Sequence, residues 1–323
     1  MSNLWRGVSS WFQRQLSTAG YYASRDVVQR GDIARIKEYL DAIRDTIQTG
    51  NGQHAYLTSN LLQLALSDEE SRIRATIAAK TPENLLLRGG KVYSQCDEDG
   101  IIAAIFSNLD GQKTFVEIAC GDGLENNTHF LLLQGWRGVW VDGSAEHITH
   151  IQSELGALSF RQLLVEKQFV DLEKIGPLIT RYCEFLGERD IDFFSLDIDG
   201  NDVHILNRSL DYFRPRVICV EYNAKFPPPL ALSMGYEPLH VWANDDYYGC
   251  SLMALVEAMR SRYTLLTCSM SGVNAFFVRD DLAHQFHIYP PEDLYQPARH
   301  HRLRELSGHP NTWKWLKAVL AES

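Results

Sequence analysis

The feature that most constrains this chain is a glycine-rich turn that directly follows a short, mostly apolar run. Residues 114–119 form the run, and Gly121 and Gly123 follow it at once. The polar residues 126–128 then lead into an apolar segment with helical spacing. A strand, a tight glycine turn and a helix in this order let the backbone approach a ligand closely. The turn therefore indicates a ligand site, although an ordinary strand–helix turn without a ligand would look similar.

The acidic residues around this turn narrow the kind of ligand. Glu117 precedes the turn, Asp122 lies inside it, and Asn126 occupies the position of the third glycine of a dinucleotide-binding turn. A pyrophosphate prefers helix N–H groups without competing anions, so NAD fits poorly. S-adenosylmethionine carries an ammonium and a sulfonium and no phosphate, so it suits these acidic neighbours. A second apolar run, 138–141, ends in Asp142, which is placed to accept hydrogen bonds from ribose hydroxyls.

Carboxylates also gather after a later apolar run. Asp197 and Asp199 follow residues 193–196, and Glu221 and Asn223 end the next run. Oxygen ligands from two adjacent strands suit Mg²⁺ or Mn²⁺, and clustered carboxylates repel one another without a cation. In the alternative interpretation Asp197 contacts the cofactor, Asp202 caps the following helix, and no metal binds.

Strand-like and helix-like segments alternate through the middle of the chain, which predicts a parallel sheet with crossover helices. The expected strands are 114–119, 138–142, 159–165, 192–197 and 216–221. After an expected helix at 251–260 come two more strands, 263–268 and 273–279, joined by a short turn. A turn that short makes only an antiparallel pair. The expected fold class is therefore α/β, with an antiparallel pair at the end.

The segments outside this alternation are expected to be helical. In residues 1–90, Ile36, Leu40, Ile43 and Ile47 form a narrow apolar seam suited to a dimer contact, to packing on the core or to a lid over the acceptor. An aromatic face within residues 1–16 is the alternative, as a peripheral membrane contact. The alternating segments would form one domain that spans 91–289. The tail, 290–323, is expected to hold one helix near 313–320.

Composition excludes some partners. The formal net charge is −10, which disfavours nucleic acid. No apolar run reaches the ~20 residues of a membrane span. The six cysteines show no CxxC spacing and favour a reducing, cytoplasmic location.

A long segment, 222–249, contains three consecutive prolines and several aromatic residues. Loops this long are often functional lids, although a packed structural loop is the alternative. His240 within it is a candidate catalytic base, as are His129 and His204 on the expected helices that follow the two ligand loops.

Taken together, these residues resemble the FkbM-type branch of class I S-adenosylmethionine-dependent methyltransferases over residues 91–282. The resemblance is carried by YSQCDEDGI (93–101), FVEIACGDGLENNT (115–128), WRGVWVDGS (136–144), LDIDGND (196–202), VICVEYN (217–223) and GVNAFFVR (272–279). It implies a Rossmann-like seven-stranded sheet with an antiparallel last pair. Asp199 matches the aspartate of the family's Lys-Ile-Asp-x-Glu-Gly block, in which Asp197 replaces the lysine and Asn201 the glutamate.

The resemblance also implies roles for individual residues. Gly121 and Gly123 would pass under the methionine part of S-adenosylmethionine. Gln95 and Asp99 would lie near the amino-acid end of the cofactor. The expected cofactor contacts are Gln95, Asp99, Glu117, Gly121, Asp122, Gly123, Asn126, Asp142, Gly143, Ser144 and Asp197. The expected catalytic residues are Asp197, Asp199 and His240, and the expected metal ligands are Asp197, Asp199, Glu221 and Asn223.

The sequence thus predicts an S-adenosylmethionine-dependent O-methyltransferase. By resemblance, its acceptor is a sugar hydroxyl of a polysaccharide or glycosylated natural product. The apolar seam of residues 1–90, which the resemblance does not cover, predicts a homo-oligomer formed through the N-terminal helices. The alternatives are an NAD(P)-dependent oxidoreductase and a non-catalytic assembly module with a degenerate nucleotide fold.

Overall fold

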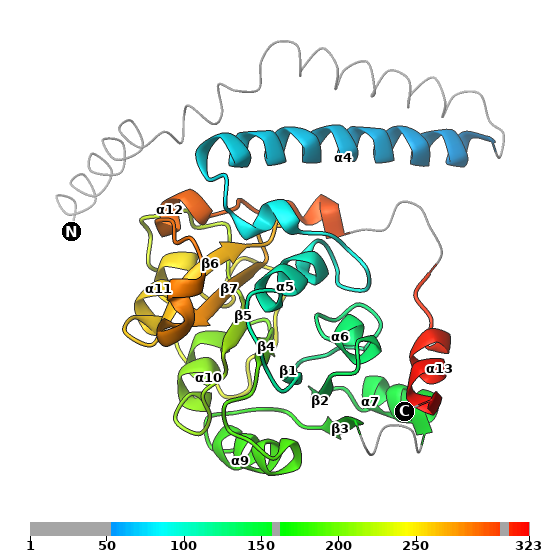
Figure 1. Cartoon of the computed structure of the whole chain (residues 1–323), viewed down its shortest axis with the longest axis vertical. Coiled ribbons are helices and arrows are strands. Elements are labelled where there is room, and N and C mark those ends of the chain that lie inside the picture. Colours follow the sequence, from blue (N-terminus) through cyan, green and yellow to red (C-terminus); the bar gives the residue numbers. More distant parts are fainter. Residues whose placement is uncertain (1–52, 157–161, 304–309, 323) are drawn as a thin grey trace. The chain divides into compact units, whose positions relative to one another are not determined.

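The computed structural model describes residues 53–156, 162–303 and 310–322. Contacts divide the chain into two units, Met1–Glu70 and Ser71–Ser323. The long helix α4, Gln53–Lys80, includes the expected helical segments at 61–66 and 73–79 (Figure 1). The predicted seam and the aromatic face at 1–16 lie outside the described residues.

The second unit is built on one seven-stranded mixed sheet. Its strands are β1 Thr114–Ile118, β2 Arg137–Asp142, β3 Leu163–Lys167, β4 Phe193–Leu196, β5 Val217–Glu221, β6 Tyr263–Cys268 and β7 Asn274–Arg279. They lie in the order β3-β2-β1-β4-β5-β7-β6. The first five strands are parallel, and β7 pairs antiparallel with both β5 and β6. The predicted α/β class and antiparallel last pair are confirmed. The third strand begins later than expected, at Leu163.

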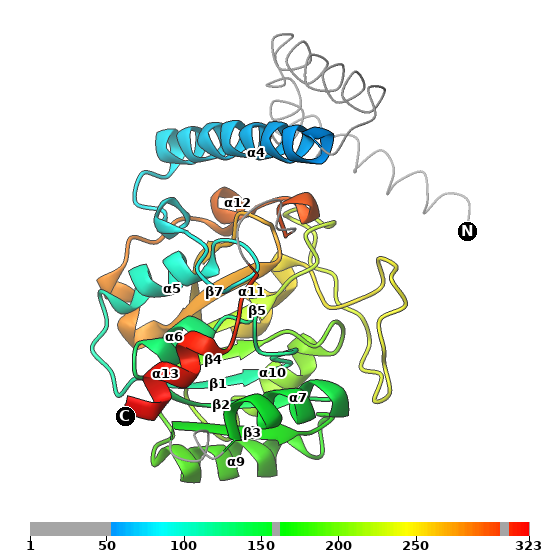
Figure 2. The same ribbon diagram turned by 90° about the vertical axis from the view of Figure 1, so that its right-hand side faces the viewer.

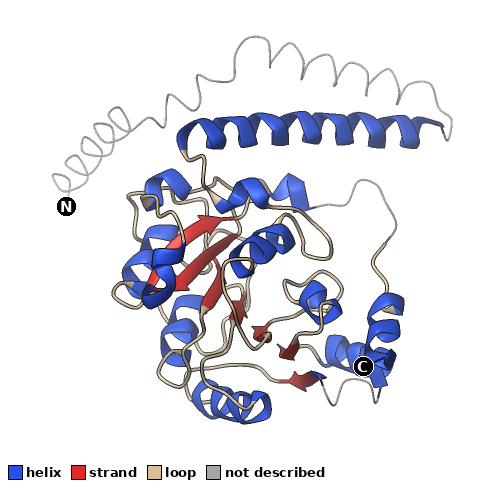
Figure 3. Cartoon of the chain, in the orientation of Figure 1, coloured by secondary structure: helices blue, strands red, loops and turns tan. Residues whose placement is uncertain are grey.

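Helices cover both faces of this sheet (Figure 3). One face packs on α5 Glu98–Phe106, α6 His129–Leu133, α7 Ala145–Leu155 and α13 Lys314–Glu322. The other packs on α9 Ile175–Leu186, α10 Asp202–Ser209, α11 Leu252–Met259 and α12 Pro291–Leu294. Successive residues of β1 point to opposite faces, so Phe115 and Val116 enter different cores. Because helices cover both faces, neither side chain is exposed.

The remaining elements are short. The described residues include three 3₁₀ helices that connect the longer elements: η1 Leu85–Arg88, η3 Asp280–Gln285 and η4 His300–Leu303. A turn containing Gly272, whose φ is +74°, joins β6 to β7. All six cysteines are buried and unpaired. No helix in the described ranges is both long enough and apolar enough to cross a membrane.

Candidate active site at the carboxyl edge of the sheet

A pocket of about 190 Å³ lies where the adjacent strands β1 and β4 end. Its lining residues are Gln95, Glu117, Ala119, Cys120, Gly121, Asp122, Glu125, Asn126, Asn127, Asp197 and Asn274. Four of them are acidic, and none of these described lining residues is lysine or arginine. Such a pocket attracts a cationic ligand and disfavours a phosphate.

The two glycines of the turn have different surroundings. Both have positive φ, +59° at Gly121 and +77° at Gly123. A Cβ atom at Gly121 would meet nothing within 4 Å, whereas one at Gly123 would lie 2.8 Å from Trp313 and 3.0 Å from Trp140. Gly123 also does not line the pocket. The expected close approach to a ligand therefore falls to Gly121, and the space beside Gly123 is filled by indole rings.

Glu117 organises the turn from inside β1. Its carboxylate accepts hydrogen bonds from Asn126 Nδ2 at 2.6 Å, the backbone N–H of Asn127 at 2.9 Å and the Thr128 hydroxyl at 2.5 Å. Burial raises the pKa of Glu117 to about 7, because its effect is larger than that of these hydrogen bonds, which lower the pKa. Glu117 borders the pocket, but the contacts that occupy its oxygens are with the turn itself.

Asp142, at the end of β2, connects the glycine turn to the segment that begins α7. It accepts from the backbone N–H of Gly121 at 2.9 Å and from that of Ser144 at 2.7 Å. Ser144 caps α7 through its hydroxyl. Gly143 between them is exposed, and a Cβ there would lie 3.6 Å from the ring of Phe169. Each oxygen of Asp142 retains a lone pair for a hydroxyl donor.

Phe169 is a residue that sequence reasoning missed. It follows β3, and its ring is 45% exposed. Only the fold brings it next to Gly143, so no local pattern could reveal it.

The block before α5 contributes less to the pocket than expected. Gln95 lines it, but Asp99 does not. One carboxylate oxygen of Asp99 accepts from the backbone N–H groups of Val92, Tyr93 and Ser94 and from the Ser94 hydroxyl. Asp99 therefore holds the preceding turn through this oxygen, while its other oxygen is buried without a hydrogen-bond partner among the described residues. Its expected position near the cofactor stays a prediction.

Asn274, at the start of β7, takes a place in the pocket that sequence reasoning did not foresee. Its amide donates to Glu98 at 3.2 Å, and its buried carbonyl oxygen has no hydrogen-bond partner among the described residues. That oxygen is available to a donor on a ligand.

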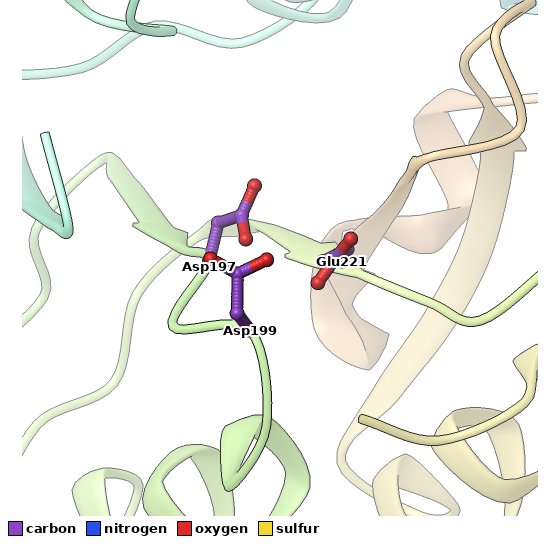
Figure 4. A group of neighbouring side chains, drawn as sticks. All are labelled: Asp197, Asp199 and Glu221. Atoms are coloured by element: carbon purple, nitrogen blue, oxygen red, sulfur yellow. The ribbon is translucent and has the colours of Figure 1, made fainter. Parts of the chain in front are cut away.

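Three carboxylates meet beside the pocket, as the sequence predicts. Oxygen atoms of Asp197, Asp199 and Glu221 all lie within 4.8 Å of one another, and Figure 4 shows them converging from the ends of β4 and β5. Burial and then the neighbouring acids raise the pKa of Asp197 to about 8, and burial and then Asp197 raise that of Glu221. Glu221 is 9% exposed, and its Oε2 has no hydrogen-bond partner in the described chain. The cluster needs either protons or a cation.

Two neighbours of this cluster hold the backbone instead. Asp202 accepts from the N–H groups of Ile198 and Gly200, both at 2.8 Å, and so fixes the turn after β4. The side chain of Asn223 donates to the carbonyls of Asp246 and Tyr248 and accepts from Lys225 N–H. The side-chain nitrogen of Asn223 is thus held by the long loop and its oxygen accepts one backbone N–H, and its metal-ligand role stays a prediction.

Of the candidate histidines, His240 alone lies at the cluster. Its ring packs on Gly200, where a Cβ would come within 2.3 Å of it, and its Nε2 is buried without a partner among the described residues. Burial raises the pKa of Asp199, and a protonated His240 would act in the opposite direction. His204 instead bonds the Met234 carbonyl at 3.0 Å.

His129 belongs to the core. It stacks on Tyr93 with ring centroids 4.0 Å apart, and its Nδ1 contacts the Gly123 carbonyl at 2.6 Å. Burial lowers its pKa to about 4. The ring is fully buried, so these contacts lend no support to His129 as a catalytic base.

The loop between β5 and α11 reaches from this cluster into solvent. Figure 2 shows it, in yellow, extending from the sheet. Asn201 fixes it by donating to the Glu237 carbonyl at 2.7 Å and accepting from the Glu237 N–H at 3.1 Å. Leu239 and Val241, on either side of His240, are 83% and 77% exposed. The loop thus directs one histidine inward and an apolar tip outward.

Comparison with known proteins adds a structural likeness. No protein-family model matches the chain, and no curated protein sequence does. An O-methyltransferase from Bacillus cereus in complex with SAH (S-adenosylhomocysteine) is similar at 16% identity and a TM-score of 0.35, covering 55% of this chain and 79% of that one. An S-adenosylmethionine-dependent methyltransferase from Clostridium acetobutylicum ATCC 824 is similar at 11% identity and a TM-score of 0.35, covering 64% and 97%. Similarity this low establishes no shared function.

Proposed function

We propose that this chain is an S-adenosylmethionine-dependent O-methyltransferase. The observation that carries the proposal is the acidic pocket beside Gly121, at the carboxyl edge of a sheet with an antiparallel last strand. The ammonium and sulfonium of the cofactor suit four lining carboxylates. A pyrophosphate would meet those carboxylates without a lysine or arginine among the described lining residues, which disfavours NAD.

The site residues supply distinct contacts in this proposal. Gly121 leaves room for the methionine part, and Gln95 and Asn274 border the same pocket. Asp142 accepts from the ribose hydroxyls while it holds the Gly121 N–H. The exposed ring of Phe169, next to Gly143, offers a stacking surface for the adenine.

Methyl transfer to an oxygen also needs a route for the acceptor's proton. Binding positions the hydroxyl in line with the methyl group, and a base receives the proton. Asp199 and His240 stand at the cluster for this purpose. Asp197, Asp199 and Glu221 also fit a divalent cation such as Mg²⁺ or Mn²⁺, because Glu221 directs an unpartnered buried oxygen at the cluster. Such an ion would lower the pKa of the hydroxyl.

The acceptor in this proposal is a sugar hydroxyl of a polysaccharide or glycosylated natural product. Its support is the family resemblance and the exposed aromatic residues Trp242 and Tyr247 on the loop beside His240, which suit stacking on a sugar.

Calorimetric titration with S-adenosylhomocysteine and with NAD tests the cofactor. We expect S-adenosylhomocysteine alone to bind, and Asp142→Asn to weaken it by about 1–3 kcal/mol, since the variant keeps the shape but loses one acceptor. Asp110→Asn, an exposed acid that does not line the pocket, is the matched control and should bind normally. Binding of NAD would identify an oxidoreductase, and binding of neither would favour the assembly module.

A further inference from the structure

The C-terminal helix packs beside the elements that carry the glycine turn. Leu316 and Leu320 of α13 are buried in the same core as α6 and α7, and Lys317 pairs with Glu154 of α7 at 2.5 Å. Figure 1 shows α13, in red, beside α6 and α7. The end of the chain is thereby held next to a loop that lies far earlier in the sequence.

Trp313, directly before α13, fills the space that Gly123 leaves. Its Cη2 would lie 2.8 Å from a Cβ at Gly123, and its side chain is 5% exposed. Its ring centroid lies 5.6 Å from that of His129 and 6.2 Å from that of Trp140. Trp140 in turn donates to the Thr128 hydroxyl at 2.6 Å. The indole of Trp313 therefore completes an aromatic layer behind the turn.

Hydrogen bonds hold the same turn at two successive carbonyl groups. Asn311 Nδ2 donates to the Leu124 carbonyl at 2.7 Å, and His129 Nδ1 lies 2.6 Å from the Gly123 carbonyl. A carbonyl oxygen only accepts, so His129 carries its proton on Nδ1. The hydrogen bond from His129 comes from α6, directly after the turn, and the one from Asn311 comes from the segment before α13.

We propose that Asn311 and Trp313 act as positioning residues that hold the glycine turn in its ligand-binding conformation. Neither lines the pocket, so both act through the backbone of residues 121–124. The left-handed φ angles of Gly121 and Gly123 are readily exchanged for others in a free chain, and ordering them in advance removes that cost from ligand binding. The identity of the ligand rests on the proposed function; the positioning does not.

The experiment compares Asn311→Ala and Trp313→Ala with Trp315→Ala in the full-length chain. Trp315 lies in α13, two residues after Trp313, and is 71% exposed, so it controls for the loss of an indole. Hydrogen exchange of the amides at 121–128 is measured without ligand, and the Kd for S-adenosylhomocysteine is measured by calorimetry. We expect faster exchange at these amides and a Kd raised about tenfold in both test variants, with Trp313→Phe recovering part of each.

The outcomes separate this proposal from the proposed function. A stabilising role alone would lower the melting temperature while leaving exchange at 121–128 and the Kd below that temperature unchanged, and this result would overturn the proposal. Asn311→Ala removes a single hydrogen bond and keeps the test valid if Trp313→Ala does not fold. If the unmodified protein binds no S-adenosylhomocysteine, the proposed cofactor is wrong, and the exchange data still decide whether Asn311 and Trp313 hold the turn.

Discussion

Replacing Glu117 by glutamine should make the protein more stable at alkaline pH. The pKa of Glu117 is about 7 in the folded protein, against an ordinary 4.5. The folded state therefore holds a proton that the unfolded state has released, and stability falls as pH rises from about 4.5 to about 7. A difference of about 2.5 units corresponds to about 3 kcal/mol. Glutamine cannot ionise, so the free energy of unfolding of Glu117→Gln should exceed that of the unmodified protein by about this amount at pH 8.

The competing effect is the loss of hydrogen bonds to an ionised acceptor. Asn126, Asn127 and Thr128 all donate to Glu117, and a hydrogen bond to a charged group contributes about 1.5–3 kcal/mol. The raised pKa means that burial outweighs these donors. Glutamine keeps an oxygen for one or two of them and offers its amide to the buried Asn126 carbonyl oxygen, which has no partner among the described residues.

Urea unfolding at pH 5 and pH 8 measures the effect. The two proteins should differ by less than about 1 kcal/mol at pH 5 and by about 3 kcal/mol at pH 8, with Glu117→Gln the more stable. Taking the difference between proteins removes the titration of Asp197 and Glu221, which both retain. Glu125→Gln, an exposed acid of the same loop, should change stability by under about 0.5 kcal/mol. If Glu117→Gln is instead less stable than the unmodified protein at pH 8, the donors outweigh burial and the reasoning is refuted.

Two further changes test the pocket and the carboxylate cluster. Gly121→Val should remove measurable S-adenosylhomocysteine binding while the circular dichroism spectrum stays native. A Cβ at this position meets nothing within 4 Å, and the left-handed φ adds a strain cost of about 1–2 kcal/mol. Retained affinity would place the ligand elsewhere. Mg²⁺ should raise the melting temperature more at pH 8 than at pH 5.5, because the ion must displace protons from Asp197 and Glu221, whose pKa values are raised. Glu221→Gln should abolish this increase. An equal increase in that variant would exclude the carboxylate cluster as the metal site. EDTA should reduce activity if the ion assists the reaction, whereas full activity of the chelated enzyme would leave Asp199 or His240 to act as the base.

The parts of the site that follow from strand order could be predicted from the sequence. Adjacent parallel strands end at one edge, so Asp197 and Glu221 had to lie close together. The short turn before β7 likewise required an antiparallel pair.

Other parts depend on where distant segments return, which no local pattern records. Gly123 resembles Gly121 in the sequence, and the packing of Trp313 and Trp140 distinguishes them. Asn223 has the chemistry of a metal ligand, but the folding of the loop at 246–248 occupies its amide. Asp99 is expected at the cofactor because its block precedes β1, yet the backbone of residues 92–94 surrounds it.

The six buried cysteines make thiol alkylation a probe of motion in this protein. Burial raises the thiol pKa at Cys120, Cys183 and Cys219, and thiolates are the reactive form, so none should react quickly while the fold is closed. Cys120 differs in lining the pocket. Its alkylation rate should follow local opening of the glycine turn, whereas the rate at Cys219 in β5 should follow unfolding of the sheet. A ligand that protects Cys120 more than Cys219 would thereby reveal its own location without a structure of the complex.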